Sequence, residues 1–331
     1  MVALLNNQWR GNIDAYEKNC TLLEGDAVME RLGYAVLNVV VVLFFAPLCE
    51  GFVRKYIRAN LAHSRRGPLV GIWQPFYDLL KLFAKEDIRV GGALQTVMPY
   101  IAFSSMLVAS LFLPLCGYAP LDGFGDLIVF VYTVSLFAIS LAVLALDTGS
   151  PYSSIGALRE IMLMTLVELI FITSLICGAV CAHTLRLSGI ILWYRMRFFS
   201  LPMLIAAGVV FMAMLAQFGR LPFDIPEAEQ EIIGGPFMEV SGPRLALLKW
   251  AVYMRQFISA SLFATVFIPW CLTGVFVIDL IITLVKVLIT FVLVTLVEVL
   301  SPRLRVDQAL NFYLGVFLTS AIAIAIAYVA P

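Results

Sequence analysis

The chain has 331 residues and no formal net charge at neutral pH, and 62% of its residues are hydrophobic against 13% charged. A mean hydropathy of +0.96 excludes a soluble globular protein, and the zero net charge argues against nucleic acid as a partner. Residues 1–32 mix acidic and basic side chains without the apolar core of a signal peptide. We therefore expect an N-terminal extracytoplasmic segment over 1–32 and a membrane domain over 33–331.

Eight apolar runs of about 20 residues follow, each long enough to cross a bilayer as a helix. They cover residues 33–53, 97–117, 126–146, 158–182, 200–218, 256–274, 277–298 and 309–330. The predicted fold is therefore all-α, a polytopic membrane protein with about eight transmembrane helices. No internal repeat stands out, which argues against an inverted-repeat transporter.

Lys and Arg residues are divided unevenly between the two sets of connections. Fifteen belong to the connections after the first, third, fifth and seventh runs, and six belong to the other side. Because loops rich in Lys and Arg stay in the cytoplasm, we expect the connection after the first helix to be cytoplasmic and both termini to be extracytoplasmic. The connection 183–199 fits poorly, because it carries Arg186, Arg195 and Arg197.

The first long connection contains a predicted amphipathic helix over residues 74–85. Pro75 stands where such a helix begins, while Asp78 and Lys81 lie off its apolar stripe. The stripe consists of Phe76, Leu79, Leu80 and Phe83. We expect the helix to lie along the membrane surface or against neighbouring helices; plain core packing is the alternative for Phe83.

The second long connection, residues 219–239, concentrates acidic side chains in a chain that is otherwise poor in charge. Its carboxylates are Asp224, Glu227, Glu229, Glu231 and Glu239, and apolar pairs at 232–233 and 237–238 surround them. Carboxylates crowded near a low dielectric do not all ionise at once, so we expect at least one to have a raised pKa. Such a cluster would exchange protons easily; the alternative is helix capping plus solvation.

Local spacing predicts a short helix inside this acidic connection. Asp224 and Glu227 have the separation of a helix N-cap and its N3 partner, with Pro226 in the first turn. On such a helix Asp224, Glu227 and Glu231 share one side, and Glu229 points away.

Four ionisable residues fall within or at the ends of the predicted spans, where charge is rare. Glu168 lies near the middle of the fourth span, and Glu160 precedes it by about 12 Å along the axis. Lys286 lies at the middle of the seventh span, and Glu298 lies at its end. Each costs roughly 2.5–3.5 kcal/mol unless it is paired or hydrated. They indicate either structural ion pairs or a relay of protonatable groups through the membrane interior.

Metal-ligating residues are sparse and scattered. The six Cys form no Cys-x-x-Cys pattern, and there are only two His. This excludes the usual zinc and iron–sulfur ligand sets, so we expect the cysteines to be small buried residues.

These motifs together resemble the eight-helix subunit that joins the peripheral arm to the membrane arm of respiratory complex I, and its relatives in membrane-bound [NiFe] hydrogenases. The likeness runs from about Leu32 to the end of the chain. It rests on Arg65-Arg-Gly-Pro68, Gln74-Pro-Phe, Asp78-x-x-Lys81-Leu-Phe-x-Lys-Glu86, Gly156-Ala-Leu-Arg159 with Glu168 beyond it, and Pro222-Phe-Asp-x-x-Glu-x-Glu-x-Glu231 followed by Glu239.

Some of the motifs separate two branches of this family. Leu146-Asp-Thr-Gly-Ser-Pro151, Ser241-Gly-Pro and Lys249-Trp250 look like the hydrogenase branch, which includes the formate hydrogenlyase and CO-induced hydrogenase types. The stretch 69–73 is shorter than in the complex I branch, which argues against quinone binding. The region 250–253 also lacks an acid that the complex I branch carries. Residues 81–86 and 226–231, in contrast, are closer to complex I.

The resemblance implies a subunit that is non-catalytic by itself and belongs to a membrane-bound [NiFe] hydrogenase in a bacterial or archaeal cytoplasmic membrane. It would anchor the soluble hydrogenase module and couple electron transfer to H⁺ or Na⁺ translocation. The implied partners are the hydrogenase large and small subunits, an iron–sulfur subunit and antiporter-like membrane subunits. No cofactor is expected on this chain, and the [NiFe] centre and iron–sulfur clusters belong to the partners.

The resemblance also assigns roles to individual residues. The residues expected in proton relay and coupling are Glu160, Glu168, Asp224, Glu227, Glu229, Glu231, Glu239 and Lys286. Those expected at the interface with the soluble arm are Arg65, Arg66, Asp78, Lys81 and Arg220. Two alternatives remain, a quinone-site subunit of a complex I-like NADH:quinone oxidoreductase and a freestanding transporter.

Overall fold

The computed structural model describes residues 26–58, 71–88, 90–115, 119–121, 127–197, 200–226, 229–269 and 276–329, and these residues form helices without any strand. Eight long helices make up the body of the protein. They are α2 (Asp26–Phe52), α5 (Ala93–Leu111), α6 (Leu127–Asp147), α7 (Pro151–Ala182), α9 (Leu201–Gln217), α11 (Gly242–Val266), α12 (Phe276–Leu300) and α13 (Val306–Val329). Shorter elements are the π-helix η1 (Val53–Arg58), α4 (Gln74–Phe83), α8 (Leu187–Arg197), α10 (Glu229–Ile232) and the 3₁₀ turn η2 (Gly235–Phe237).

Each of the eight predicted spans corresponds to one long helix, so the all-α polytopic membrane fold is confirmed. Among the described residues, six helices are long and apolar enough to cross a bilayer. The other two are α9, which is shorter, and α11, which is more polar. The predicted start of α11 at residue 256 was wrong, because Arg244 and Arg255 were taken for loop residues. Both lie on α11 and are buried inside the protein.

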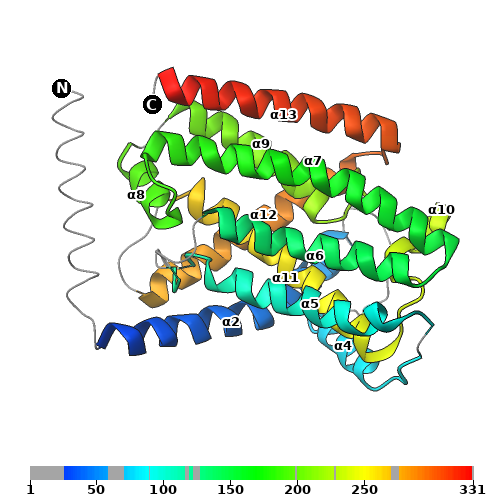
Figure 1. The fold of residues 1–331 in the computed structure, drawn as a ribbon. Helices are drawn as coiled ribbons and strands as arrows, with labels where there is room; N and C mark the ends of the chain where they lie inside the picture. Colours follow the sequence, from blue (N-terminus) through cyan, green and yellow to red (C-terminus); the bar gives the residue numbers. More distant parts are fainter. Residues whose placement is uncertain are drawn as a thin grey trace, which may run out of the picture.

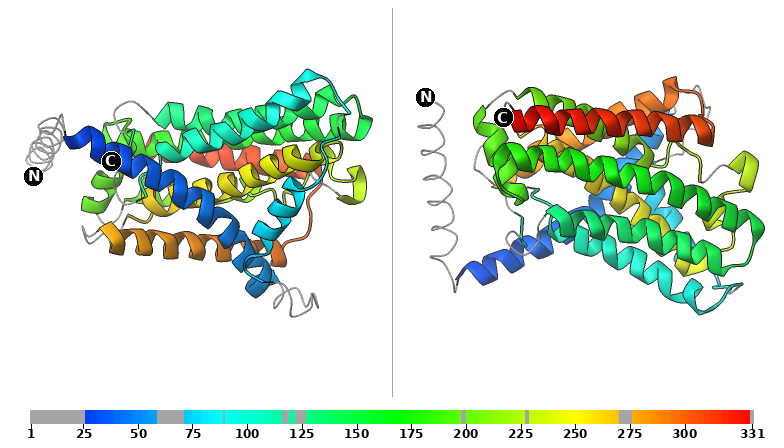
Figure 2. Two further views of the ribbon diagram at one scale, coloured as in Figure 1. Left: turned by 90° about the horizontal axis from the view of Figure 1, so that it is seen from below. Right: turned by 45° about the horizontal axis from the view of Figure 1, so that its top comes forward.

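Helix α11 lies at the centre of the bundle, in contact with α2, α4, α5, α9 and α12. Around it, α6 packs between α5 and α7, and α13 packs along α7 and α9, as Figure 1 shows. The π-helical continuation of α2, η1, contacts α12, and the blue and orange helices cross in the left view of Figure 2. The central position of α11 explains its composition, because protein rather than lipid surrounds most of its length.

The two predicted structured connections lie at the same end of the bundle. Figure 1 places α4 and α10 together there, with α8 at the opposite end. A direct link is made by Ser241, whose side-chain oxygen accepts from the backbone N–H of Ile88 at 3.1 Å and donates to its carbonyl at 3.2 Å. The loop before α5 and the loop before α11 therefore form one surface.

The predicted amphipathic helix is present as α4, with Pro75 in its first turn, as expected. Its apolar stripe is only partly buried within the chain. Pro75 and Leu79 are buried, whereas Leu80 is 64% and Phe83 39% exposed. The ring of Phe83 nevertheless contacts Trp250 of α11, with 6.4 Å between the ring centroids. Plain core packing thus does not describe this helix, and half of the stripe faces away from the rest of the chain.

Arg244 links the start of α11 to the connection before α5 through an ion pair and a hydrogen bond. Its side chain is 2% exposed, and its Nε contacts the Asp87 carboxylate at 2.6 Å. Its Nη2 donates to the Ile88 carbonyl at 2.9 Å. Gly242 allows this approach, because its φ is +60° and a Cβ there would lie 2.6 Å from the Glu86 carbonyl oxygen.

We expect Arg244→Met to destabilise the protein by about 1.5–3 kcal/mol, because it removes charge-assisted hydrogen bonds from a buried site. Thermal unfolding of the purified protein in detergent should show a lower midpoint. Lys249→Met is the matched control, since Lys249 is an exposed residue on the same helix. Equal midpoints for the two variants would contradict the role assigned to Arg244.

Candidate functional site: two buried acid–arginine clusters

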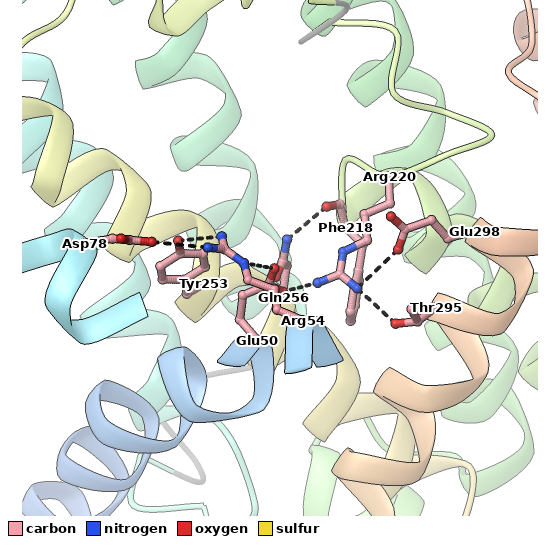
Figure 3. A network of polar contacts seen from close by, with 9 residues as sticks. All are labelled: Glu50, Arg54, Asp78, Phe218, Arg220, Tyr253, Gln256, Thr295 and Glu298. Atoms are coloured by element: carbon pink, nitrogen blue, oxygen red, sulfur yellow. Dashed lines mark hydrogen bonds and ion pairs between the residues drawn. The ribbon is translucent and has the colours of Figure 1, made fainter. Parts of the chain in front are cut away.

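A polar network joins four α-helices, a π-helix and a loop at the end of the bundle that carries α4 and α10. Figure 3 shows its members, which come from α2, η1, α4, α11, α12 and the loop after α9. We call it the Glu50 network, and its ionisable members are Glu50, Arg54, Asp78, Arg220, Tyr253 and Glu298. Glu50 lies at its centre and is 3% exposed.

Glu50 bridges two arginines, one on each of its carboxylate oxygens. Arg54 Nε contacts Oε1 at 2.9 Å, a pairing that the four-residue spacing along the chain brings about. Arg220 Nη2 contacts Oε2 of the same carboxylate. Because both Glu50 and the Arg220 side chain are buried, neither charge could persist here without its partner.

From this centre the network extends in two directions. Toward α4, Arg54 Nη1 contacts Asp78 Oδ2 at 3.3 Å, and its Nη2 donates to the Tyr253 hydroxyl at 3.1 Å. Toward α12, Arg220 Nη1 lies 3.5 Å from Glu298 Oε2. The Glu50 network thus links the surface helix α4 to the end of α12 through two arginines.

Hydrogen bonds between α9 and α11 hold the Arg220 loop in place. Gln256 Nε2 donates to the Phe218 carbonyl at 2.9 Å, and Ser259 donates to Gln217 Oε1 at 2.6 Å. The guanidinium carbon of Arg220 also lies 5.5 Å from the centre of the Phe218 ring. These contacts fix the point at which α9 ends and Arg220 turns toward Glu50 (Figure 3).

A second cluster lies between α7 and α11, where Glu160 meets Arg255. The Arg255 Nη1 to Glu160 Oε1 distance is 3.5 Å, and the two side chains are 4% to 5% exposed. The guanidinium carbon of Arg255 lies 4.6 Å from the centre of the Phe137 ring. The sequence placed Glu160 inside an apolar span, and the structure buries it against Arg255, which was assigned to a loop.

Glu168 is the next acid along α7, two helical turns beyond Glu160. It is half-buried, and Ser135 on α6 lies near it. Arg255 influences both acids electrostatically. The positive charge of the buried Arg255 side chain thus acts on both Glu160 and Glu168.

The prediction that Asp224 caps a short helix was wrong. Residues 225 and 226, which would follow Asp224 in the first turn of such a helix, are not helical, and the next described helical residues belong to α10, which begins at Glu229. Phe223 and Ile225, which are both 2% exposed, draw this part of the loop into the bundle. Asp224 consequently lines a small cavity together with Glu160 and Arg255.

Glu231 forms ion pairs with two arginines at the surface. Its carboxylate contacts Arg159 Nη1 at 2.7 Å and Arg303 Nη2 at 3.6 Å. The hydrogen bond from Arg159, with the nearby charges of Arg303 and Arg305, lowers the pKa of Glu231. Glu231 is therefore not the acid with the raised pKa that was expected in this loop; it holds α10 against α7 and against the connection before α13.

The Gly156-Ala-Leu-Arg159 motif is explained by this part of the structure. A Cβ at Gly156 would lie 2.8 Å from Gly235 Cα and 2.8 Å from Pro236 Cδ. Only a residue without a side chain lets the η2 turn rest against α7. One helical turn later, Arg159 holds Glu231, and Glu160 points into the protein.

The remaining candidate residues lie apart from these two clusters. Lys286 donates to the Ile268 carbonyl at 2.7 Å, just beyond the end of α11. Glu239 is half-buried, and its backbone carbonyl accepts from Gln95 Nε2 at 3.0 Å. Lys81 is exposed on α4. Arg65, Arg66 and Glu227 lie outside the described residues, as does the side chain of Glu229.

One interface assignment needs correction. Arg220 was expected to face the soluble arm, but its side chain is 5% exposed and pairs with Glu50 and Glu298 inside the chain. Asp78, in contrast, is a partly exposed residue of α4 and contacts Arg54. Arg220 therefore belongs to the Glu50 network.

Sequence reasoning missed Glu50, Arg54 and Arg255. Glu50 and Arg54 fall where the first apolar run gives way to a basic stretch, so they look like ordinary flanking charges. The usable signal was their four-residue spacing at the end of a span. No group of three or more metal-ligating side chains occurs among the described residues.

Comparison with known proteins finds a matching family and similar proteins over most of the chain. A family model described as NADH dehydrogenase matches residues 33–329. Hydrogenase-4 component C of Escherichia coli (strain K12) is 38% identical over 291 residues, covering 84% of this chain and 89% of that protein. Formate hydrogenlyase subunit 4 of the same organism is 34% identical over 284 residues, covering 83% of this chain and 91% of that protein.

A solved structure is similar over most of the bundle. It is a chain in the structure of the membrane-bound sulfane sulfur reductase, an archaeal respiratory membrane complex. The TM-score is 0.79 at 26% sequence identity, and the match covers 91% of this chain and 99% of that chain. With its all-α membrane bundle and this agreement along nearly its whole length, the chain belongs to the NADH dehydrogenase family, the family of complex I subunit 1.

Proposed function

We propose that this chain is the integral membrane subunit of a multisubunit membrane-bound [NiFe] hydrogenase. It anchors the soluble hydrogenase module and couples electron transfer to the translocation of H⁺ or Na⁺. Its family and its likeness to hydrogenase-4 component C and formate hydrogenlyase subunit 4 support this. The observation that carries the proposal is the pair of buried acid–arginine clusters at the end of the bundle that bears α4 and the acidic loop.

The arrangement suggests how coupling works. The soluble module binds at the end that carries α4, where Asp78 and Lys81 are accessible. A change in charge or position there reaches Glu50 through Arg54, and reaches Glu160 through the loop that carries Asp224. Glu160 and Glu168 then act as protonatable groups inside the bundle.

The partners follow from this role. They are the hydrogenase large and small subunits, an iron–sulfur subunit and antiporter-like membrane subunits, which complete the path of the ion. The [NiFe] centre and the iron–sulfur clusters belong to these partners, and this chain binds no cofactor of its own. The remaining surface of the helices faces lipid.

A quinone-site subunit of a complex I-like enzyme is the less favoured alternative. Two relatives of this chain are named as subunits of hydrogenase complexes. The stretch 69–73 is also short where the complex I branch shapes its quinone chamber. Quinone-dependent activity of the purified complex would favour the alternative.

We expect the α4 end of the bundle to face the cytoplasm and both termini to lie outside. Lys85→Cys should react with a membrane-impermeant thiol reagent in inverted vesicles, and Leu185→Cys should react in intact spheroplasts. Both positions are exposed. Lys85 follows α4 and Leu185 precedes α8, and these two helices lie at opposite ends of the bundle in Figure 1. A background without native cysteines serves as the control, and the reversed pattern would overturn the orientation.

Glu168→Gln should leave the complex assembled and its turnover with artificial donors largely unchanged. Ions moved per H₂ should fall by at least roughly tenfold, because the substitution keeps the shape but removes a titratable group. Proteoliposomes containing the purified complex give both measurements. Asp307→Asn, which removes an exposed carboxylate, is the control. A normal ion gradient with Glu168→Gln would make Glu168 a structural acid.

Glu231→Gln and Arg159→Gln should each open the acidic loop, and the double variant should open it no further than Glu231→Gln alone, which already removes the contacts with both Arg159 and Arg303. We expect a coupling of roughly 0.2–1 kcal/mol, the range of exposed ion pairs. Because its pKa is lowered on folding, Glu231 contributes stability above the ordinary pKa of a glutamate. That contribution is lost as the pH falls through the pKa in the folded protein.

The rate of proteolysis in the acidic loop measures this opening. Wild type and the single variants should converge at acidic pH, where Glu231 is protonated. Additive effects of the two substitutions at neutral pH would mean that the contact between Arg159 and Glu231 does not hold the loop.

A further inference from the structure

Helix α4, at the edge of the bundle in Figure 1, has a second apolar side that the described part of the chain leaves exposed. Trp73 stands at the start of the helix, and Tyr77 and Leu80 follow at spacings of four and three residues. These spacings place all three on one side of a helix. Trp73 is 50%, Tyr77 62% and Leu80 64% exposed. We call these three residues the outer stripe.

Packing within the chain accounts for the other apolar side of α4. Pro75 and Leu79 are buried there. The ring of Phe76 contacts Phe44 of α2, with 5.5 Å between the ring centroids. The helix therefore presents apolar residues in two directions, toward the bundle and away from it. The outer stripe needs an occupant from outside the chain.

The outer stripe continues the exposed side of α2. This helix is long and apolar enough to cross the bilayer, and exposed apolar residues recur on it every four positions, at Leu32, Val36, Val40 and Phe44. The ring of Phe44 contacts Trp73, with 5.9 Å between the ring centroids. One exposed apolar surface thus runs along a membrane-spanning helix and turns onto α4. Since its α2 part lies in the bilayer, lipid is the occupant that fits both parts.

The residue types of the outer stripe suit the boundary between acyl chains and headgroups. Trp and Tyr are enriched at this depth, because each combines an apolar ring with a polar group. Lys81 follows the outer stripe directly, and Lys85 lies just beyond the end of the helix; both are exposed. Lysines beside the apolar side of an interfacial helix extend their ammonium groups to the headgroups.

The charges near the outer stripe leave a positive excess at the surface. Asp78 is the acid within α4, and its carboxylate contacts Arg54 of η1 at 3.3 Å. Of the two acids that follow the helix, Asp87 pairs with Arg244, and Glu86 offsets one of the two lysines. An anionic headgroup therefore complements this surface better than a zwitterionic one.

We propose that the outer stripe, with Lys81 and Lys85, binds an anionic phospholipid of the leaflet at the α4 end of the bundle. An acyl chain lies along the outer stripe, and the two lysines contact the headgroup phosphate. The lipid thereby holds in place the helix whose Asp78 contacts Arg54 of the Glu50 network. The inference rests on the membrane location of α2 and does not depend on which reaction the complex carries out.

Photo-crosslinking of the intact complex in nanodiscs tests this surface. The bilayer holds equal amounts of phosphatidylglycerol and phosphatidylcholine, and one of the two carries a diazirine near the glycerol end of an acyl chain. Mass spectrometry locates the attached lipid. We expect both probes to label residues 32–40 of α2 equally. The phosphatidylglycerol probe should label residues 73–85 roughly fivefold more than the phosphatidylcholine probe, the effect of about one lysine near an anionic headgroup.

Two double variants separate charge from apolar contact. Lys81→Gln with Lys85→Gln should make the two probes label residues 73–85 equally. Lys81→Arg with Lys85→Arg is the matched control and should keep the wild-type preference, because both charges remain. Labelling of residues 32–40 reports correct insertion of each variant.

Two results would overturn the proposal. Equal labelling of residues 73–85 by the two probes in the wild-type complex would mean that the surface does not select an anionic lipid. Residues 73–85 without label, while residues 32–40 are labelled, would mean that a partner protein covers the outer stripe.

Discussion

A buried arginine in a membrane domain is stable only with a carboxylate or several carbonyls beside it, and this constraint shapes the interior of the protein. Arg220, Arg244 and Arg255 are all at most 5% exposed. Each contacts an acid that comes from a different element of the chain. The ion pairs therefore fix how the helices stand relative to one another: α2 against α12, the connection before α5 against α11, and α7 against α11.

The two clusters are joined by one short stretch of chain, residues 219–226. Arg220 reaches Glu50 and Glu298 at one end of this stretch. Four residues later, Asp224 reaches the cavity beside Glu160. Because Phe223, between them, is buried, a displacement of this stretch requires the surrounding helices to adjust with it. A displacement of this loop therefore changes the surroundings of both clusters together, which is the property that a coupling element needs.

The helices and the intramembrane acids were predictable from the sequence, because long apolar runs and charges within them are local signals. Glu160 and Glu168 stand out against their apolar neighbours in this way. Arg255 does not stand out, because it lies at the edge of an apolar run and therefore looks like a loop residue. Only the tertiary packing shows that other helices enclose α11. The predicted cap at Asp224 failed for a similar reason. Burial of Phe223 and Ile225 outweighs the local capping pattern, and residues 225 and 226 are not helical.

The close approach of the η2 turn to Gly156 has a consequence for membrane energetics. Pro236 rests against α7 at the position where a Cβ would lie, and it also lines the cavity beside Glu160. This contact forms part of the wall beside an acid inside the bundle. Any side chain at position 156 would push the turn outward and admit bulk water to Glu160. The close packing beside Glu160 thus depends on the absence of a single methyl group.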